Sequence, residues 1–86
     1  MAKRVYNRRV DPEVEALKLK VGERIRNLRL EMNINQDDFA RKANIHRAHV
    51  GKLENGEVDP TLGTLYKVAK ALKVDVGRLV AKELKN

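Results

Sequence analysis

The sequence predicts an all-α domain built from five short helices. Apolar side chains recur at steps of three and four residues, a spacing that places them on one face of a helix. No stretch alternates apolar and polar residues for long enough to indicate a strand. Residues that cap or end helices stand between the apolar-patterned segments. The core must be largely aliphatic, because the only aromatic residues are Tyr6, Phe39 and Tyr66.

A basic arm, residues 1–12, precedes the first predicted helix. Its stretch KRVYNRR lacks helical periodicity, and it is either a tail without fixed structure or a segment that reaches DNA phosphates or a groove. Pro12 after Asp11 is typical of a helix start. Gly22 costs a helix about 1 kcal/mol, so the helix begins either near Gly22 or at Pro12. It is expected to end at Asn33, with an inward stripe of Val14, Leu17, Val21, Ile25, Leu28 and Met32.

The next two predicted helices are short and closely spaced. Asn35 is expected to cap the first of them, with Asp38 three residues later in the capping-box position. The second covers about residues 47–54, with His46 at its N-cap position and Gly56 as the left-handed residue after its end. The residues expected to face the core are Phe39, Ala40, Ala43, Val50 and Leu53.

Two further helices complete the predicted domain, which spans residues 13–81. Thr61 is expected to cap the fourth helix and Asp75 the fifth. The polar tail, residues 82–86, is expected to fray. The apolar residues assigned to these two helices are Leu62, Leu65, Val68, Ala69 and Leu72, followed by Val76, Leu79 and Val80.

Composition narrows the classes of function. The net charge is +7 over 86 residues, and this basic balance favours a polyanionic partner such as nucleic acid. Cysteine and serine are absent, so disulfides are excluded and two common catalytic nucleophiles are missing. No apolar run approaches the roughly 18 residues that span a bilayer. We therefore expect a cytoplasmic protein that is not an enzyme, needs no cofactor and does not enter a membrane.

Two short helices joined by a tight turn are typical of the helix-turn-helix motif. The second helix, residues 47–54, carries basic and polar side chains on the side away from its apolar residues. In such a motif the first helix crosses the DNA backbone, and the second lies in the major groove, where its outward side chains reach base edges. The pattern therefore predicts binding to double-stranded DNA.

Residues 22–80 resemble the lambda-repressor-like, or Xre-type, helix-turn-helix family. The resemblance is carried by VGERIRNLR, NQDDFARKANIHRAHVGKLENG and PTLGTLYKVAKALKV, which together cover about two-thirds of the chain. Within the family the chain most resembles small stand-alone regulators, such as the controller proteins of restriction–modification systems and compact phage-type repressors. The resemblance implies a five-helix domain that acts as a sequence-specific transcriptional regulator.

The resemblance also implies which residues read the bases. Arg47, Ala48, His49 and Lys52 match the base-facing positions of the family's recognition helix. Arg47 and Lys52 can each bind O6 and N7 of guanine, and Ala48 can touch a thymine methyl group. His49 can reach a base or a phosphate. Each good base contact would contribute about 1–3 kcal/mol of discrimination.

Other positions match family residues outside the base-reading set. Gln36 matches a residue that hydrogen-bonds a DNA phosphate, and Asn35 and Asn55 stand where the family also contacts the backbone. Arg29 and Glu54 match a pair that usually forms an ion pair between the first and third helices. We interpret that pair as structural rather than as a base contact.

The sequence departs from the family pattern at three places. The loop after Gly56 carries Glu57 and Asp59, where some family members carry basic residues, so phosphate contacts from this loop are not expected. His46 replaces the usual small hydroxyl cap. Gly51 weakens the recognition helix, which is expected where DNA or a neighbouring helix comes close.

Two clusters of polar residues suggest chemistry that we disfavour. His46 and His49 have the spacing H-x-x-H, but without cysteine or suitably spaced acids they do not predict a metal site. Asp37 and Asp38 are adjacent carboxylates, and their place at a helix start explains them better than acid–base catalysis does.

We expect the protein to bind a palindromic operator as a homodimer, with half-sites about 34 Å apart. The predicted dimer surface is the fifth helix, with Val76, Leu79 and Val80, extended by the first helix. The alternative is that these residues only close the core, in which case the protein can be a monomer. The main rival function is that of an antitoxin-type module that binds a partner protein and represses its own promoter. We expect no domain for a small-molecule effector.

Overall fold

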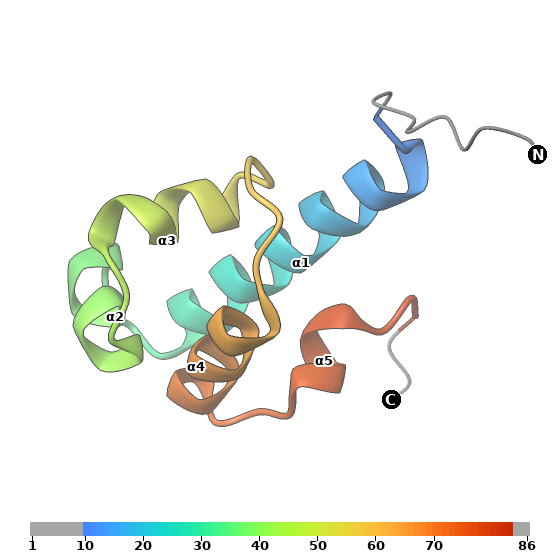
Figure 1. Ribbon diagram of the computed structural model, residues 1–86. Helices are drawn as coiled ribbons and strands as arrows, with labels where there is room; N and C mark the ends of the chain where they lie inside the picture. Colours follow the sequence, from blue (N-terminus) through green and yellow to red (C-terminus); the bar gives the residue numbers. More distant parts are fainter. Residues whose placement is uncertain (1–9, 84–86) are drawn as a thin grey trace, which may run out of the picture.

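A computed structural model describes residues 10–83 of the protein (Figure 1). Within this range the chain forms five helices and no strand, which confirms the predicted all-α fold. Residues 1–9 of the predicted arm and residues 84–86 of the predicted tail lie outside the described range. The helices are α1 (Pro12–Glu31), α2 (Gln36–Ala43), α3 (Arg47–Glu54), α4 (Leu62–Leu72) and α5 (Val76–Val80).

Helix α1 is a single continuous helix that begins at Pro12, one residue before the predicted domain boundary. Asp11 is its N-cap, and the Asp11 carboxylate accepts a hydrogen bond of 2.8 Å from the backbone N–H of Glu13. The helix passes through Gly22 without a break, so the start at Pro12 is the correct alternative of the two. Asn33 follows its end in the left-handed conformation, with φ of 63°.

Helix α1 is the central element of the fold (Figure 1). It packs against α3, α4 and α5, while α2 packs against α3 and α4. The first turns of α1 extend beyond the other helices that pack on it, at the end of the molecule opposite α2. The largest fully buried side chains come from all five helices and form one aliphatic core around a single aromatic ring: Ile25, Phe39, Val50, Val68 and Leu79.

Most of the predicted helix boundaries are confirmed. The side chain of Asn35 caps α2 by accepting a 2.8 Å hydrogen bond from the N–H of Asp38. Thr61 caps α4 in the same way, through a 3.1 Å bond from the N–H of Thr64. Gly56 follows α3 with φ of 71°, a left-handed conformation that favours glycine.

The predicted apolar stripes need three corrections. Val14 and Leu17 are 40% and 39% exposed. Val14 lies in the first turn of α1, which extends past the elements that cover the rest of the helix. Leu17 borders an open hollow between α1 and the end of α5. Leu62, in the first turn of α4, is 78% exposed and does not face the core.

Within the described range, no helix is both long enough and apolar enough to cross a membrane.

Gly22 lies where α1 comes very close to the backbone of α3. A Cβ atom at this position would lie 2.4 Å from the backbone oxygen of Leu53 and 2.6 Å from that of Glu54. The absence of a side chain therefore allows α1 to lie directly against the last turn of α3. Local helix propensity predicts only that Gly22 is a cost to the helix, and the structure shows that it is a packing requirement.

Candidate DNA-binding site

Helix α3 divides its residues between the core and the surface. Val50 and Leu53 are buried, as predicted, and they fix the helix on α1 and α2. Arg47, Ala48 and Lys52 are exposed along the opposite side. The structure therefore brings these three of the predicted base-contacting residues onto one open face.

His49 lies at the margin of that face and is half-buried. Its partial burial distinguishes it from the three exposed residues. His46 is exposed at the N-cap position of α3, and its side chain makes no capping hydrogen bond. Among the described residues, no three histidine, cysteine or acidic side chains gather closely enough to hold a metal ion.

A buried ion pair locks α3 to α1. The Arg29 guanidinium donates from Nε to Glu54 Oε2 at 2.6 Å and from Nη2 to Glu54 Oε1 at 3.0 Å. Both residues are buried, and the two parallel bonds fix the angle between the helices as well as their separation. Arg29 also donates from Nη1 to the backbone oxygen of Ile34, at 2.9 Å, which ties down the turn before α2.

The pair is structural in its geometry, since neither charged group faces the open side of α3. The hydrogen bond from Arg29 to Glu54 raises the pKa of the arginine above its ordinary value, against the opposing effect of burial. Arg29 therefore keeps its charge, and the buried Glu54 carboxylate keeps its partner. Removing either group would leave the other charge buried and unpaired.

Gln36 joins the same cluster. Its Nε2 donates to Glu54 Oε1 at 3.0 Å, so a single carboxylate holds α1, α2 and α3 together. An amide nitrogen carries two hydrogens, and this bond uses only one. Gln36 is half-buried in the first turn of α2, where the helix N-terminus favours an anion.

Asn35 and Asn55, the other two predicted phosphate contacts, are exposed at helix ends. The side-chain oxygen of Asn35 caps α2. Asn55 is the C-cap of α3, and its Nδ2 donates to Glu57 Oε2 at 3.3 Å. Each amide nitrogen retains at least one hydrogen for an external acceptor.

An ion pair on the exposed side of α3 was not predicted from the sequence. Arg47 Nε lies 2.9 Å from Asp37 Oδ1, across the turn between α2 and α3. Asp37 was expected only at the start of α2, where it does lie. One feature of the sequence could have indicated this pair. Arg47 is a cation at a helix N-terminus, where cations are unfavourable, and the first turn of α3 contains no acidic residue to offset it.

The predicted dimer surface requires a correction at Leu79. Its side chain is fully buried in the core of its own chain, so it is not available to a partner. Val76 and Val80 are half-buried and pack against the edge of the core. Arg24 fixes the end of α5 by donating from Nη1 to the backbone oxygen of Leu79 at 3.0 Å.

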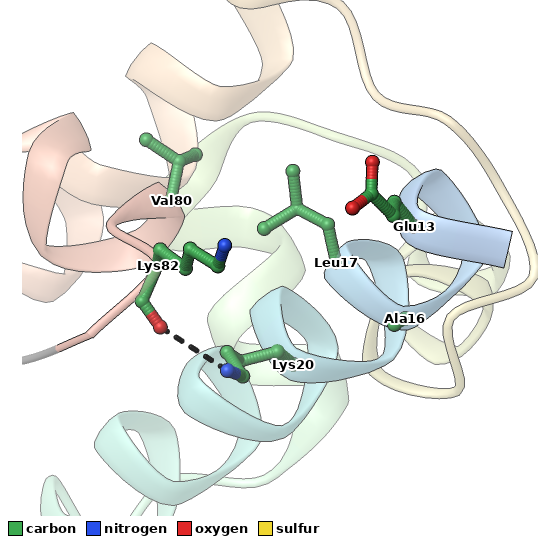
Figure 2. A pocket seen from close by; sticks show the side chains of 6 residues that line it. All are labelled: Glu13, Ala16, Leu17, Lys20, Val80 and Lys82. Atoms are coloured by element: carbon green, nitrogen blue, oxygen red, sulfur yellow. Dashed lines mark hydrogen bonds between the residues drawn. The ribbon is translucent and has the colours of Figure 1, made fainter. Parts of the chain in front are cut away.

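Val80 faces the exposed start of α1 across a hollow of about 330 Å³ (Figure 2). Leu17 lies on the α1 side of this hollow and Val80 on the α5 side. Lys20 donates to the backbone oxygen of Lys82 at 3.1 Å and closes one edge. The structure thus places the part of α1 around Leu17 and Lys20 beside the end of α5.

Comparison with known proteins agrees with this geometry. The family model described as Helix-turn-helix matches residues 25–79, which contain the end of α1 and almost all of α2 to α5. The chain belongs to the Xre-type helix-turn-helix family. Members of this family are DNA-binding transcriptional regulators, and the matched region contains every predicted base- and phosphate-contacting residue.

This helix-turn-helix protein is similar to two kinds of curated regulator. It is 38% identical over 63 residues to the immunity repressor protein of Bacillus phage phi105, a match that covers 73% of this chain but only 44% of the repressor. It is 36% identical over 67 residues to the control protein C.SmaI of Serratia marcescens, which covers 77% of this chain and 80% of that protein.

The same helix-turn-helix fold is found in solved structures. The restriction–modification controller protein C.AhdI from Aeromonas hydrophila superposes with a TM-score of 0.72 and 31% sequence identity. The match covers 74% of this chain and 97% of that protein. The predicted resemblance to small stand-alone regulators is therefore confirmed.

Proposed function

We propose that this DNA-binding transcriptional regulator reads its operator by inserting α3 into the major groove. The observation that carries the proposal is the open face of α3. Arg47, Ala48 and Lys52 project from a helix whose other side is fixed by the core and by the Arg29–Glu54 pair. A helix held this rigidly presents its side chains to base edges in one defined orientation.

The chemistry of the exposed residues suits base recognition. Arg47 and Lys52 supply donors for O6 and N7 of guanine, and the methyl group of Ala48 suits a thymine methyl. His49, at the half-buried margin, reaches a base or a phosphate at the edge of the groove. Each base contact would add about 1–3 kcal/mol of discrimination.

Phosphate contacts from Gln36, Asn35 and Asn55 would set the position of α3 in the groove. Gln36 is the best placed of the three, because its bond to Glu54 orients the amide while leaving one hydrogen free. The exposed Glu57 and Asp59 in the following loop are acidic and would be repelled by the backbone. Contacts on this side therefore end near Asn55.

We propose further that two copies bind together on a palindromic operator, through α5 and the first turns of α1. Val14 and Leu17 are exposed apolar residues on α1, and Val80 faces Leu17 across the hollow of Figure 2. Burying this surface between two copies would place two recognition helices on one face of the duplex, with half-sites about 34 Å apart. Dimerisation would also supply the interface area that a single α3 lacks.

The test of operator reading is selection of bound sequences from random duplex DNA, followed by salt titration of the selected site. We expect a palindrome whose preference is lost in Arg47→Ala and Lys52→Ala. The control is Lys70→Ala, which removes the same charge from an exposed position on α4. It should retain the palindrome. Salt-sensitive binding without any enriched sequence would refute sequence-specific reading and favour the rival function, binding to a partner protein.

The test of the dimer is sedimentation of the protein in the absence of DNA. Leu17→Lys should shift the equilibrium toward monomer, because it places a charge in the proposed interface. Leu62→Lys is the matched control, since Leu62 is also exposed but lies on α4, outside the hollow. A monomeric wild-type protein at all accessible concentrations would contradict the proposed interface.

A further inference from the structure

Arg47 is the first residue of α3, which is an unfavourable place for a cation. The N-terminus of a helix carries a partial positive charge, and acidic residues are normally favoured there. The first turn of α3 contains no acidic residue. The carboxylate near this helix end comes instead from Asp37 of α2, whose Oδ1 lies 2.9 Å from Arg47 Nε.

The ion pair with Asp37 is made at Nε of the guanidinium. Arginine offers five N–H donors in a rigid planar fork. A carboxylate on Nε leaves the opposite edge, formed by Nη1 and Nη2, available for two parallel hydrogen bonds. O6 and N7 of guanine accept such a pair.

Gly51 leaves space for this arrangement of Arg47. The guanidinium lies along α3, and a Cβ atom at position 51 would be 3.6 Å from Arg47 Nη1. That distance is ordinary contact for a methyl group, whereas a larger side chain would displace the guanidinium. The glycine that sequence analysis associated with DNA or a neighbouring helix therefore lies beside the Arg47 side chain.

Asp37 is an unexpected residue for a surface that meets DNA. It lies in the first turn of α2, next to Gln36, which we propose to be a phosphate contact. A negative charge at this place weakens binding to every DNA sequence through repulsion of the phosphates. At the start of α2 the charge favours the helix. On a surface that meets DNA it has a second use if it improves discrimination between sequences.

We infer that Asp37 is a positioning residue that orients Arg47 for base recognition, and that it increases sequence discrimination while lowering overall affinity for DNA. This inference rests on the proposed insertion of α3 into the major groove. Both side chains are more than half exposed, at 53% for Arg47 and 64% for Asp37, so water weakens the pair. An exposed ion pair of this kind favours the paired orientation of the arginine over its other orientations by a factor of about five at most.

The experiment compares dissociation constants for three duplexes. These are the selected operator, the operator changed at the base pair whose preference is lost in Arg47→Ala, and an unrelated sequence. The test variant is Asp37→Asn. The matched control is Asp38→Asn, which removes the same charge from the adjacent residue, whose ion pair is with Arg41 rather than Arg47.

We expect Asp37→Asn to bind all three duplexes more tightly while its discrimination at that base pair falls about two- to fivefold. Asp38→Asn should also bind more tightly but keep the wild-type discrimination. In an Arg47→Ala background, Asp37→Asn should no longer change discrimination. A residue with only a structural role would not move affinity and discrimination in opposite directions.

Two failures can be told apart. If Asp37→Asn keeps the wild-type discrimination, as Asp38→Asn does, the positioning role is refuted and the proposed function stands. If the wild-type protein selects no sequence, the proposed function fails, and the positioning role fails with it.

Discussion

Replacing Gly22 with alanine should destabilise the domain, although the same change usually stabilises a helix. Gly22 lies inside α1, where alanine has the higher helix propensity by about 1 kcal/mol. The close approach of α3 reverses the expected sign of the change in stability. An alanine Cβ would lie 2.4 Å from the Leu53 oxygen and 2.6 Å from the Glu54 oxygen.

These distances fall short of ordinary contact, which begins at 3.4 Å, by 1.0 Å and 0.8 Å. Both atoms belong to the backbone, so no side-chain rotation relieves the overlap, and α1 and α3 must separate. Overpacking of this kind costs about 1–3 kcal/mol. The displacement also pulls Glu54 from Arg29, which adds to the cost. After the gain in helix propensity, we expect a net loss of about 1–2 kcal/mol.

The measurement is thermal unfolding followed by circular dichroism. A loss of this size lowers the Tm of a domain of this length by roughly 5–15 °C. Gly51→Ala is the control, because it lies inside α3 and its Cβ would meet only Arg47 Nη1, at 3.6 Å. That variant should gain about 0.5–1 kcal/mol. A Tm for Gly22→Ala equal to or above that of the wild type would show that close packing of α1 on α3 does not determine the effect.

Three further predictions concern stability in urea. Arg29→Met should cost about 3–5 kcal/mol by leaving Glu54 buried without its partner, and adding Glu54→Leu should restore much of the loss. Asn35→Ala should cost about 1 kcal/mol because it removes the α2 cap, whereas Asp75→Ala should be nearly neutral, since Asp75 makes no side-chain capping bond. Leu79→Ala should cost about 2–5 kcal/mol at any protein concentration. A loss that disappears at high concentration would instead place Leu79 in the dimer interface.

The helix boundaries were predictable because they depend on local chemistry. Asn35 and Thr61 cap their helices by accepting hydrogen bonds from N–H groups three residues ahead, and Gly56 adopts the left-handed conformation expected after a helix. These features depend on neighbouring residues in the chain. The sequence itself therefore carries the information.

Features that depend on how the helices pack were not predictable in the same way. Periodicity placed Val14 and Leu17 on the inward face of α1, but it cannot say that the helix extends past its neighbours. Leu79 was assigned to a surface because the apolar spacing of α5 does not distinguish a core from an interface. The role of Gly22 depends on a contact with residues more than thirty positions away, which no local pattern reveals.

The candidate site was predictable in composition but not in connectivity. The family resemblance supplied the exposed residues of α3, and the structure places Arg47, Ala48 and Lys52 on one face. The resemblance did not predict the hydrogen bond from Gln36 to Glu54 or the ion pair between Asp37 and Arg47. Gln36 and Asp37 both lie in the first turn of α2, and that position alone accounts for a polar residue there. The sequence therefore gives no separate indication that either side chain contacts a second residue.

The attachment of α3 has a consequence for how this protein can change its target. The helix is anchored by Val50, Leu53 and Glu54, while Ala48 and Lys52 are exposed on the other side. Substitutions at positions 48 and 52 therefore leave the anchor intact, and a library randomised there should consist largely of folded proteins. If these two positions contact bases, as we propose, new operator preferences would be accessible in single steps, without passing through unstable intermediates.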